Sequence, residues 1–222
     1  MLTPAGVSYG AVIFDLDGTL IDSAASLQGA AAAMMADLGL AQPDVATVSG
    51  MVGNGVPPLV ARCLTWAGAD PALATEGERR FRDHYDADPV TGVDVFAGVP
   101  QMLVTLAQGG LRLGVCTNKP EAPTATVLRA LSLGPFDAVV GGDTLPQRKP
   151  DPAPLLHCQA QLGPPVSQTL FVGDSTVDAQ TAQAAGMDYA HVRCGYQNGA
   201  LDQEPTVMLR SAAELSAVLS TE

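Results

Sequence analysis

Five short runs of aliphatic and β-branched residues recur along the chain, separated by longer stretches of helical character. Each run ends at or near a Gly, Asp, Asn or Thr, which is typical of a strand that stops at a turn. Alternation of such strands with helices is the pattern of crossover units around a buried parallel sheet. The predicted strands span residues 11–14, 111–116, 136–140, 169–172 and 189–192.

Helical segments are expected after the later strands, so the chain belongs to the α/β class. Their apolar residues recur at the spacing that places one face of a helix against a sheet. These helices are predicted at residues 121–131, 153–162, 176–185 and 212–219.

The gap between the first two strands is far longer than the dozen or so residues that a crossover needs, so it should contain an inserted domain. The insertion, residues 21–95, shows no convincing strand and is rich in Ala, Leu and Met. Gly and Pro residues divide it into candidate helices. We therefore expect a domain of residues 1–20 and 96–222 that carries a helical domain of residues 21–95. The candidate helices of the insertion span residues 24–38, 57–67 and 76–85.

Composition narrows the choice of partners. The chain is 47% hydrophobic and 15% charged, so its 222 residues can bury a substantial core. Its net charge is −12, and no cluster of Lys and Arg offers the footprint that a nucleic acid needs. A small anionic substrate is compatible with this charge, because charges more than about 8 Å away are largely screened at physiological salt. We expect a small-molecule partner, and a monomer or homodimer.

The start of the chain and its cysteines point to a cytoplasmic protein. The first basic residue is Arg62, so the positive region of a secretory signal is missing. No apolar run approaches the ~18 residues of a membrane span, so no membrane partner is expected. The four cysteines form no CxxC pair, which argues against both a zinc site and a disulfide framework.

The strongest chemical signal is the segment Asp15-Leu16-Asp17-Gly18-Thr19, where the first strand ends. Residues two apart in an extended chain point the same way, so Asp15 and Asp17 face one site. Two crowded carboxylates repel each other unless a cation or a proton is present, and Mg²⁺ prefers hard oxygen ligands of this kind. Gly18 permits a tight turn there. The plain alternative is an acidic turn without a ligand.

Two lysines follow later strands. After the second strand, Thr117 and the backbone of Asn118 could hold phosphoryl oxygens near a helix N-terminus. Lys119 ends that segment, and Lys149 precedes a helix that begins with proline. Either segment alone could be an ordinary loop. However, these are the only two lysines in the chain, against nine arginines, which indicates a need for a compact point charge.

A further acidic segment follows the fourth strand. Asp174 stands at the strand end and could complete a metal site, while Asp178 in the following helix could orient it. A helix cap is the ordinary interpretation of such residues. All these segments lie at the carboxyl ends of predicted parallel strands, where open α/β sheets bind ligands. That coincidence favours one joint site.

The chain resembles the haloacid dehalogenase superfamily, in particular its phosphoglycolate phosphatase-like branch with a helical cap. The resemblance spans nearly the whole sequence. The segment Val52-Gly53-Asn54-Gly55 also resembles the helical cap of that branch. The residues that match the four superfamily motifs are Asp15, Asp17 and Thr19; Thr117 and Asn118; Lys149 and Pro150; and Gly173, Asp174, Ser175 and Asp178.

The resemblance implies a three-layer, Rossmann-like parallel sheet with strand order 5-4-1-2-3. It also implies one Mg²⁺ held by Asp15, Asp174 and the backbone carbonyl of Asp17, with Asp178 behind these ligands. The Asp17 side chain is then not needed as a metal ligand and is available for proton transfer.

The resemblance further implies a division of roles among the catalytic and substrate-binding residues. Asp15 would attack phosphorus and form an aspartyl phosphate, and Asp17 would act first as acid and then as base. Lys149, Thr117 and Asn118 would bind the phosphoryl group. Asn54 in the cap is a candidate for substrate binding, together with Arg62 and Lys119.

The favoured substrate is 2-phosphoglycolate, with sugar phosphates, N-acetylmuramate 6-phosphate and pyrophosphate as alternatives. A phosphotransferase similar to β-phosphoglucomutase would use the same core residues. A different class is a catalytically silent binding module on this fold, since fold does not fix function. The intact set of Asp15, Asp17, Lys149 and Asp174 argues against that module.

Overall fold

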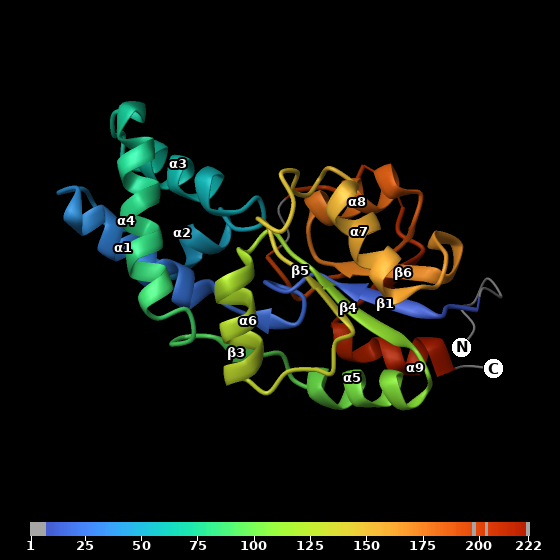
Figure 1. Ribbon diagram of the computed structural model, residues 1–222. Coiled ribbons are helices and arrows are strands. Elements are labelled where there is room, and N and C mark those ends of the chain that lie inside the picture. Colours follow the sequence, from blue (N-terminus) through green and yellow to red (C-terminus); the bar gives the residue numbers. More distant parts are fainter. Residues whose placement is uncertain (1–7, 197–198, 203, 221–222) are drawn as a thin grey trace.

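A parallel β-sheet forms the centre of the molecule (Figure 1). The structure is a computed structural model that describes residues 8–196, 199–202 and 204–220. Within this part of the chain the sheet has six strands in the order β5-β4-β1-β6-β7-β8, all paired in parallel. The strands are β1 (Ala11–Phe14), β4 (Arg112–Cys116), β5 (Ala138–Val140), β6 (Thr169–Gly173), β7 (Asp188–Val192) and β8 (Val207–Leu209).

The predicted order of five strands is confirmed, because β7-β6-β1-β4-β5 is the order 5-4-1-2-3 in sequence numbering. β8 extends the sheet beyond β7 and was not predicted. It is only three residues long and its hydrogen bonds depend on β7, so no local pattern marks it.

Helices cover both faces of the sheet, giving three layers. Along β1, Val12 and Phe14 pack with one hydrophobic cluster, while Ala11 and Ile13 pack with another, as the alternation of side chains along a strand requires. The first cluster includes α5, α6 and α9, and the second includes α7 and α8. The predicted α/β class and three-layer arrangement are therefore confirmed. These helices are α5 (Val99–Gln108), α6 (Glu121–Ala130), α7 (Ala153–Leu162), α8 (Thr176–Ala185) and α9 (Leu215–Ser220).

The helix predictions differ from the structure in two places around the sheet. α5 was not predicted, although Val99, Met102, Leu103 and Leu106 have helical spacing and are all buried. Pro100 suggests a loop, yet proline is tolerated in the first turn of a helix. The last predicted helix begins instead as the 3₁₀ turn η3. The short 3₁₀ helices are η1 (Pro71–Leu73), η2 (Val166–Gln168) and η3 (Ala212–Glu214).

The insertion between β1 and β4 forms a helical unit to one side of the sheet (Figure 1), and its residues 24–87 are here called the cap. Its buried side chains form a hydrophobic cluster of their own. We propose that the cap belongs to a separate domain, with boundaries as the sequence indicates. Its helices are α1 (Ala24–Asp37), α2 (Val45–Ser49), α3 (Val56–Trp66) and α4 (Ala74–Ala87), of which α2 was not predicted.

Two short strands join the cap to the sheet. β2 (Ile21–Asp22) and β3 (Asp94–Val95) pair antiparallel where the chain enters and leaves the insertion. The expectation of no strand in residues 21–95 was therefore wrong at its two ends. A two-residue strand carries no periodic signal and exists only through its partner.

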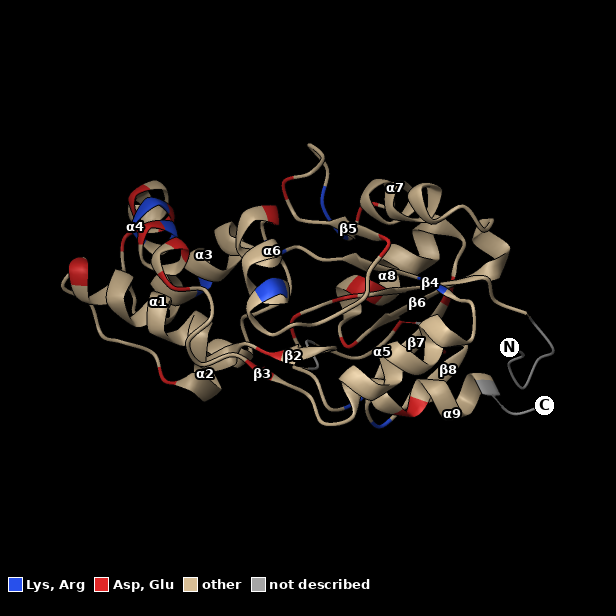
Figure 2. Ribbon diagram, turned by 60° about the horizontal axis from the view of Figure 1, so that its bottom comes forward, with Lys and Arg blue, Asp and Glu red and all other residues tan. Residues whose placement is uncertain are grey.

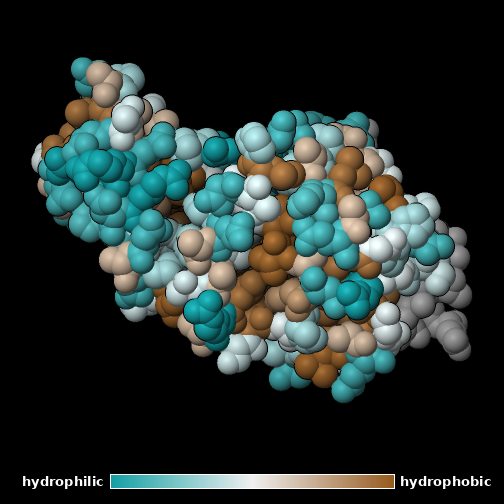
Figure 3. Space-filling view, in the orientation of Figure 1, coloured by the Kyte–Doolittle hydropathy of each residue, from teal (hydrophilic) through white to brown (hydrophobic). Residues whose placement is uncertain are grey.

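The outer face of α4 is charged and the inner face is apolar. Figure 2 shows basic and acidic residues together on this helix, and Figure 3 shows a hydrophilic surface over it. Arg79 lies 2.7 Å from Glu76 and 2.6 Å from Asp83. Such exposed ion pairs contribute little to stability, because water and salt screen them. The inner face carries Phe81 and Tyr85 into the cap's hydrophobic cluster. Among the described residues, no helix has the length and hydropathy to span a bilayer.

Candidate active site

Polar side chains converge where β1, β4 and β6 end, beneath the cap. β1 lies between β4 and β6, so the chain changes direction across the sheet at this point, which is where open α/β sheets bind ligands. The backbone N–H of Asp15 donates to the carbonyl of Val172, and that of Thr117 donates to the carbonyl of Val140. The neighbouring strands thereby fix the backbone of the site.

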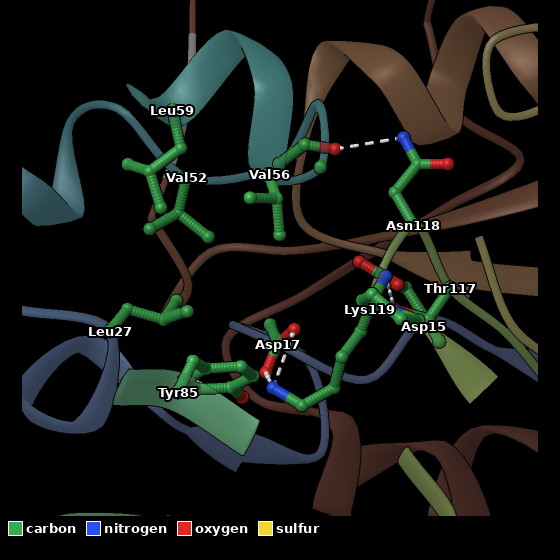
Figure 4. Close-up of a pocket in the computed structure, with 13 residues that line it drawn as sticks. Asp15, Asp17, Leu27, Val52, Val56, Leu59, Tyr85, Thr117, Asn118 and Lys119 are labelled. Atoms are coloured by element: carbon green, nitrogen blue, oxygen red, sulfur yellow. Dashed lines mark hydrogen bonds and ion pairs between the residues drawn. The ribbon is translucent and has the colours of Figure 1, made fainter. Parts of the chain in front are cut away.

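A small cavity opens between this edge and the cap (Figure 4). About 40 Å³ of it is open to the centres of water molecules, which is room for roughly three waters. The core lines it with charged and polar residues, and the cap lines it with apolar side chains and one tyrosine. The lining residues named in Figure 4 are Asp15, Asp17, Thr117, Asn118 and Lys119 from the core, and Leu27, Val52, Val56, Leu59 and Tyr85 from the cap.

Three buried carboxylates form an acidic cluster beside the cavity. Asp15, Asp174 and Asp178 each place an oxygen within 4.8 Å of the others. Burial, together with the charge of Asp178, raises the pKa of both Asp15 and Asp174 above the ordinary value. The structure therefore brings together three residues that the sequence assigned to one site.

Lys149 is the cation that faces this cluster. Its ammonium lies 2.9 Å from Asp15 and 2.7 Å from Asp178. Burial alone would lower the pKa of Lys149, but the two carboxylates raise it above the ordinary value, so the side chain stays charged. One ammonium against three carboxylates leaves two negative charges in excess if all are ionised.

That donor set fits a divalent cation. The cluster offers buried oxygen ligands, and hard divalent cations favour such ligands. A divalent cation would also balance the two excess negative charges. The residues that could hold it are Asp15 and Asp174, with Asp178 engaged behind them by Lys149 and Ser175.

Neighbouring groups fix Asp174 and Asp178 in place. Asp174 accepts hydrogen bonds from the Thr19 hydroxyl at 2.9 Å and from the backbone N–H of Tyr196 at 2.7 Å. Gly18 has a φ of +89°, and a Cβ there would overlap the Asp174 carboxylate, so only glycine fits this turn. Asp178 completes a capping box with Ser175 at the start of α8.

Asp17 forms a second ion pair, separate from the acidic cluster. Its carboxylate lies 2.9 Å from the Lys119 ammonium and accepts a hydrogen bond of 2.6 Å from the Ser23 hydroxyl. Burial alone would lower the pKa of Lys119, but the Asp17 charge raises it above the ordinary value. Lys119 and Ser23 therefore hold the Asp17 side chain, and its freedom from the metal stays a prediction.

The Asn118 side chain connects three segments. Its oxygen accepts a hydrogen bond from the backbone N–H of Lys149 at 3.0 Å. Its amide donates to the carbonyl of Lys149 at 3.0 Å and to the carbonyl of Gly53 in the cap at 3.1 Å (Figure 4). Asn118 thereby positions Lys149, and Thr117 beside it lines the cavity.

Asn54 does not line the cavity, although its neighbours Gly53 and Gly55 do. Its side-chain oxygen instead accepts a hydrogen bond of 2.6 Å from Arg62. The geometry therefore does not support the predicted substrate contact of Asn54. A loop prediction cannot tell which of several adjacent side chains turns inward.

Three residues that hold the site were not singled out from the sequence. Ser23 and Tyr196 contact the site aspartates directly, and Tyr85 lines the cavity from α4. For Tyr85 one signal was available, because it recurs four residues after Phe81 on the apolar face of a helix. That spacing predicts burial but not which side chain meets the core.

The fold and the site define a haloacid dehalogenase-like hydrolase. The model of that family matches residues 12–192, so the chain belongs to it.

Two curated relatives of this chain are both named phosphoglycolate phosphatase. The chain is 46% identical over 210 residues to the phosphoglycolate phosphatase of Rhodospirillum rubrum, covering 91% of this chain and 85% of that protein. It is 43% identical over 197 residues to the phosphoglycolate phosphatase of Cereibacter sphaeroides, covering 87% and 89%. The crystal structure of a predicted phosphoglycolate phosphatase from Haemophilus somnus superposes with a TM-score of 0.86 at 28% identity, covering 95% of this chain and 97% of that one.

Family membership makes the protein an enzyme of the hydrolase class. Phosphatases of this family generally use a divalent metal, and the buried aspartate cluster is consistent with one.

Proposed function

We propose that this enzyme is a Mg²⁺-dependent phosphatase that hydrolyses 2-phosphoglycolate through an aspartyl phosphate on Asp15. The observation that carries the proposal is the arrangement of two separate Asp–Lys pairs, Asp15 with Lys149 and Asp17 with Lys119, whose two aspartates both line one cavity. Hydrolysis through a covalent intermediate needs one carboxylate as nucleophile and another to move protons. The names of the relatives support the substrate.

In the first step Asp15 attacks phosphorus and the ester bond breaks. Asp17, which must carry a proton at this stage, donates it to the leaving oxygen, so that the group departs as an alcohol and not as an alkoxide. The covalent route divides one difficult displacement into two easier ones.

In the second step water attacks the aspartyl phosphate. Asp17, now a carboxylate, takes the proton from that water and returns to its starting form. The phosphate leaves and Asp15 is regenerated.

The phosphoryl oxygens carry negative charge throughout both steps. Lys149 offsets that charge, and the Thr117 hydroxyl with the backbone of Asn118 orients the oxygens. Mg²⁺, held by Asp15, Asp174 and the Asp17 carbonyl, would supply further positive charge at this group when bound. Asp178 holds Lys149 in place through the 2.7 Å ion pair.

We further propose a cytoplasmic enzyme with a small-molecule partner, as a monomer or homodimer. The chain has 23 acidic against 11 basic residues, which does not suit nucleic acid. The four cysteines form no CxxC pair, which is consistent with a reducing compartment.

The test is phosphate release from a panel that contains 2-phosphoglycolate, sugar phosphates, N-acetylmuramate 6-phosphate and pyrophosphate, with Mg²⁺ and with EDTA. We expect 2-phosphoglycolate to have the highest kcat/KM, and EDTA to abolish activity. The variant Asp15→Asn, purified in parallel, should release no phosphate while its circular dichroism spectrum is unchanged. Activity of that variant near wild type would contradict the mechanism, and a better substrate in the panel would replace the proposed one.

A further inference from the structure

The hydroxyl of Tyr85 is buried in the active-site cavity near the Lys119 ammonium, but no group in the described part of the chain meets hydrogen-bond geometry with it. Tyr85 is 2% exposed and lines the cavity from α4. Among the described residues its oxygen is the one buried side-chain polar atom for which no partner is found. A buried hydroxyl without a partner destabilises the folded protein. Groups of this kind in native proteins call for an explanation, and a ligand is one.

The ring of Tyr85 is held firmly, so its hydroxyl has a defined direction. Tyr85 stacks on Phe81 with ring centroids 5.7 Å apart. The ring also faces the Lys119 ammonium, which lies 5.1 Å from the ring centroid. Figure 4 shows Tyr85 pointing toward the ends of Lys119 and Asp17. Burial raises the pKa of Tyr85 above its ordinary value, so the hydroxyl is a hydrogen-bond donor at neutral pH.

The rest of the cap wall offers nothing polar on its side chains. Leu27, Val52, Val56 and Leu59 are the other side chains that the cap places at the cavity in Figure 4. A ligand that enters therefore meets apolar walls, with one neutral donor beside one cation. That combination suits an anionic oxygen, because hydrogen bonds with a charged partner are about twice as strong as neutral ones.

We propose that the Tyr85 hydroxyl and the Lys119 ammonium together bind a carboxylate of the substrate, which makes the enzyme selective for short phosphorylated carboxylic acids. The inference rests on the proposed phosphatase function and adds the group that selects the substrate.

The position of Lys119 matches the chemistry of such a substrate. In 2-phosphoglycolate a single methylene separates the ester oxygen from the carboxylate carbon. The residue that protonates the ester oxygen and the residues that bind the carboxylate must therefore be neighbours. Asp17 and Lys119 lie 2.9 Å apart, and Tyr85 lies against Lys119.

Ethyl phosphate is the matched substrate for the test, because it has two carbons and no carboxylate. For the wild-type enzyme with Mg²⁺ we expect kcat/KM for 2-phosphoglycolate to exceed that for ethyl phosphate by about 100-fold or more. A ratio near one would overturn the proposal without any variant.

The variant Tyr85→Phe removes only the hydroxyl. We expect kcat/KM for 2-phosphoglycolate to fall about 10–100-fold, mainly through KM, because one hydrogen bond to a charged group is lost. The value for ethyl phosphate should change little, so the ratio of the two substrates measures carboxylate recognition alone. A general loss of structure would lower both values.

The control is Tyr9→Phe. The Tyr9 hydroxyl donates to Asp188 at 2.7 Å, at the edge of the sheet opposite the active site, so the substrate ratio should stay at the wild-type value. If the wild-type enzyme hydrolyses 2-phosphoglycolate but Tyr85→Phe leaves the ratio unchanged, the carboxylate site is wrong and the phosphatase function stands. If the wild-type enzyme releases no phosphate from any phosphorylated acid, the proposed function itself fails.

Discussion

Each of the two lysines in this chain is buried against an aspartate at the site. Lys149 neutralises part of the charge around Asp15, and Lys119 pairs with Asp17. Arginine supplies the other nine basic positions. A compact ammonium fits a confined site where a planar guanidinium would need more room, so substitution by arginine is not conservative here.

Replacement of Asp17 by asparagine should slow both half-reactions. Proton transfer by a side chain in this role is typically worth about 10²–10⁴ in rate. We expect kcat for 2-phosphoglycolate to fall by that factor. With p-nitrophenyl phosphate, whose leaving group needs no proton, the first half-reaction should persist and the phosphorylated enzyme should accumulate, as measured by mass spectrometry after a rapid quench.

The control for this variant is Asp202→Asn, an exposed carboxylate that accepts a long hydrogen bond of 3.3 Å from the Gln180 side chain. It should be as active as the wild type. Normal turnover of 2-phosphoglycolate by Asp17→Asn would show that Asp17 does not move the protons.

The sequence predicted the site residues at the strand ends of the sheet better than those that the cap contributes. Asp15, Asp174 and Lys149 follow strand ends, and the parallel sheet alone brings strand ends together. Whether Tyr85 or Asn54 faces the cavity depends on how the cap helices pack against the sheet domain. That docking is a tertiary contact between separate hydrophobic clusters, and no local periodicity encodes it.

The helices α7 and α8 carry capping residues in their own sequence, and both were predicted with the bounds that the structure shows. α8 begins with the Ser175 capping box and ends before Gly186, which has a left-handed conformation. α7 starts at a proline and ends before Gly163. In contrast, the short strands β2, β3 and β8 exist only through a partner strand, so their own residues do not identify them.

Packing between β4 and α7 leads to a prediction about stability. A Cβ on Gly114 would lie 2.8 Å from the Cys158 sulfur and 3.1 Å from Leu162, closer than ordinary contact. The helix therefore sits against the sheet where the strand has no side chain. We expect Gly114→Ala to lower the free energy of unfolding by about 1–3 kcal/mol, measured by urea denaturation.

Gly29→Ala is the matched control, because Gly29 lies within α1 and a Cβ there would contact nothing within 4 Å. Alanine favours the helix over glycine by about 1 kcal/mol, so this variant should be more stable than the wild type. Equal stability of the two alanine variants would contradict the packing argument.

The protein has a net charge of −12, and three of its carboxylates form the buried acidic cluster at the active site. The acidic cluster has one lysine for three carboxylates, so the metal-free protein holds unbalanced charge in its interior. Asp174→Asn removes one of those charges. In EDTA we expect this variant to melt above the wild type, by about 2–4 °C for each kcal/mol gained.

With Mg²⁺ the order of the two melting temperatures should reverse. The ion stabilises whichever protein binds it, so the wild type should gain and Asp174→Asn should gain little. Differential scanning fluorimetry over a Mg²⁺ titration measures both, with Asp202→Asn expected to follow the wild type. An equal Mg²⁺ effect on all three proteins would place the metal elsewhere.

The position of β1 between β4 and β6 has a consequence for the newly synthesised chain. Thr19 and Asp174 are hydrogen-bonded although 155 residues separate them. At about 5–20 residues per second, the ribosome needs roughly 8 to 30 seconds to make that stretch. During this time β1 is exposed without one of its neighbours, and the cap helices, which contact mainly each other, can form first. The active site therefore cannot form before Asp174 has been synthesised, and until then β1 lacks one of its two neighbouring strands.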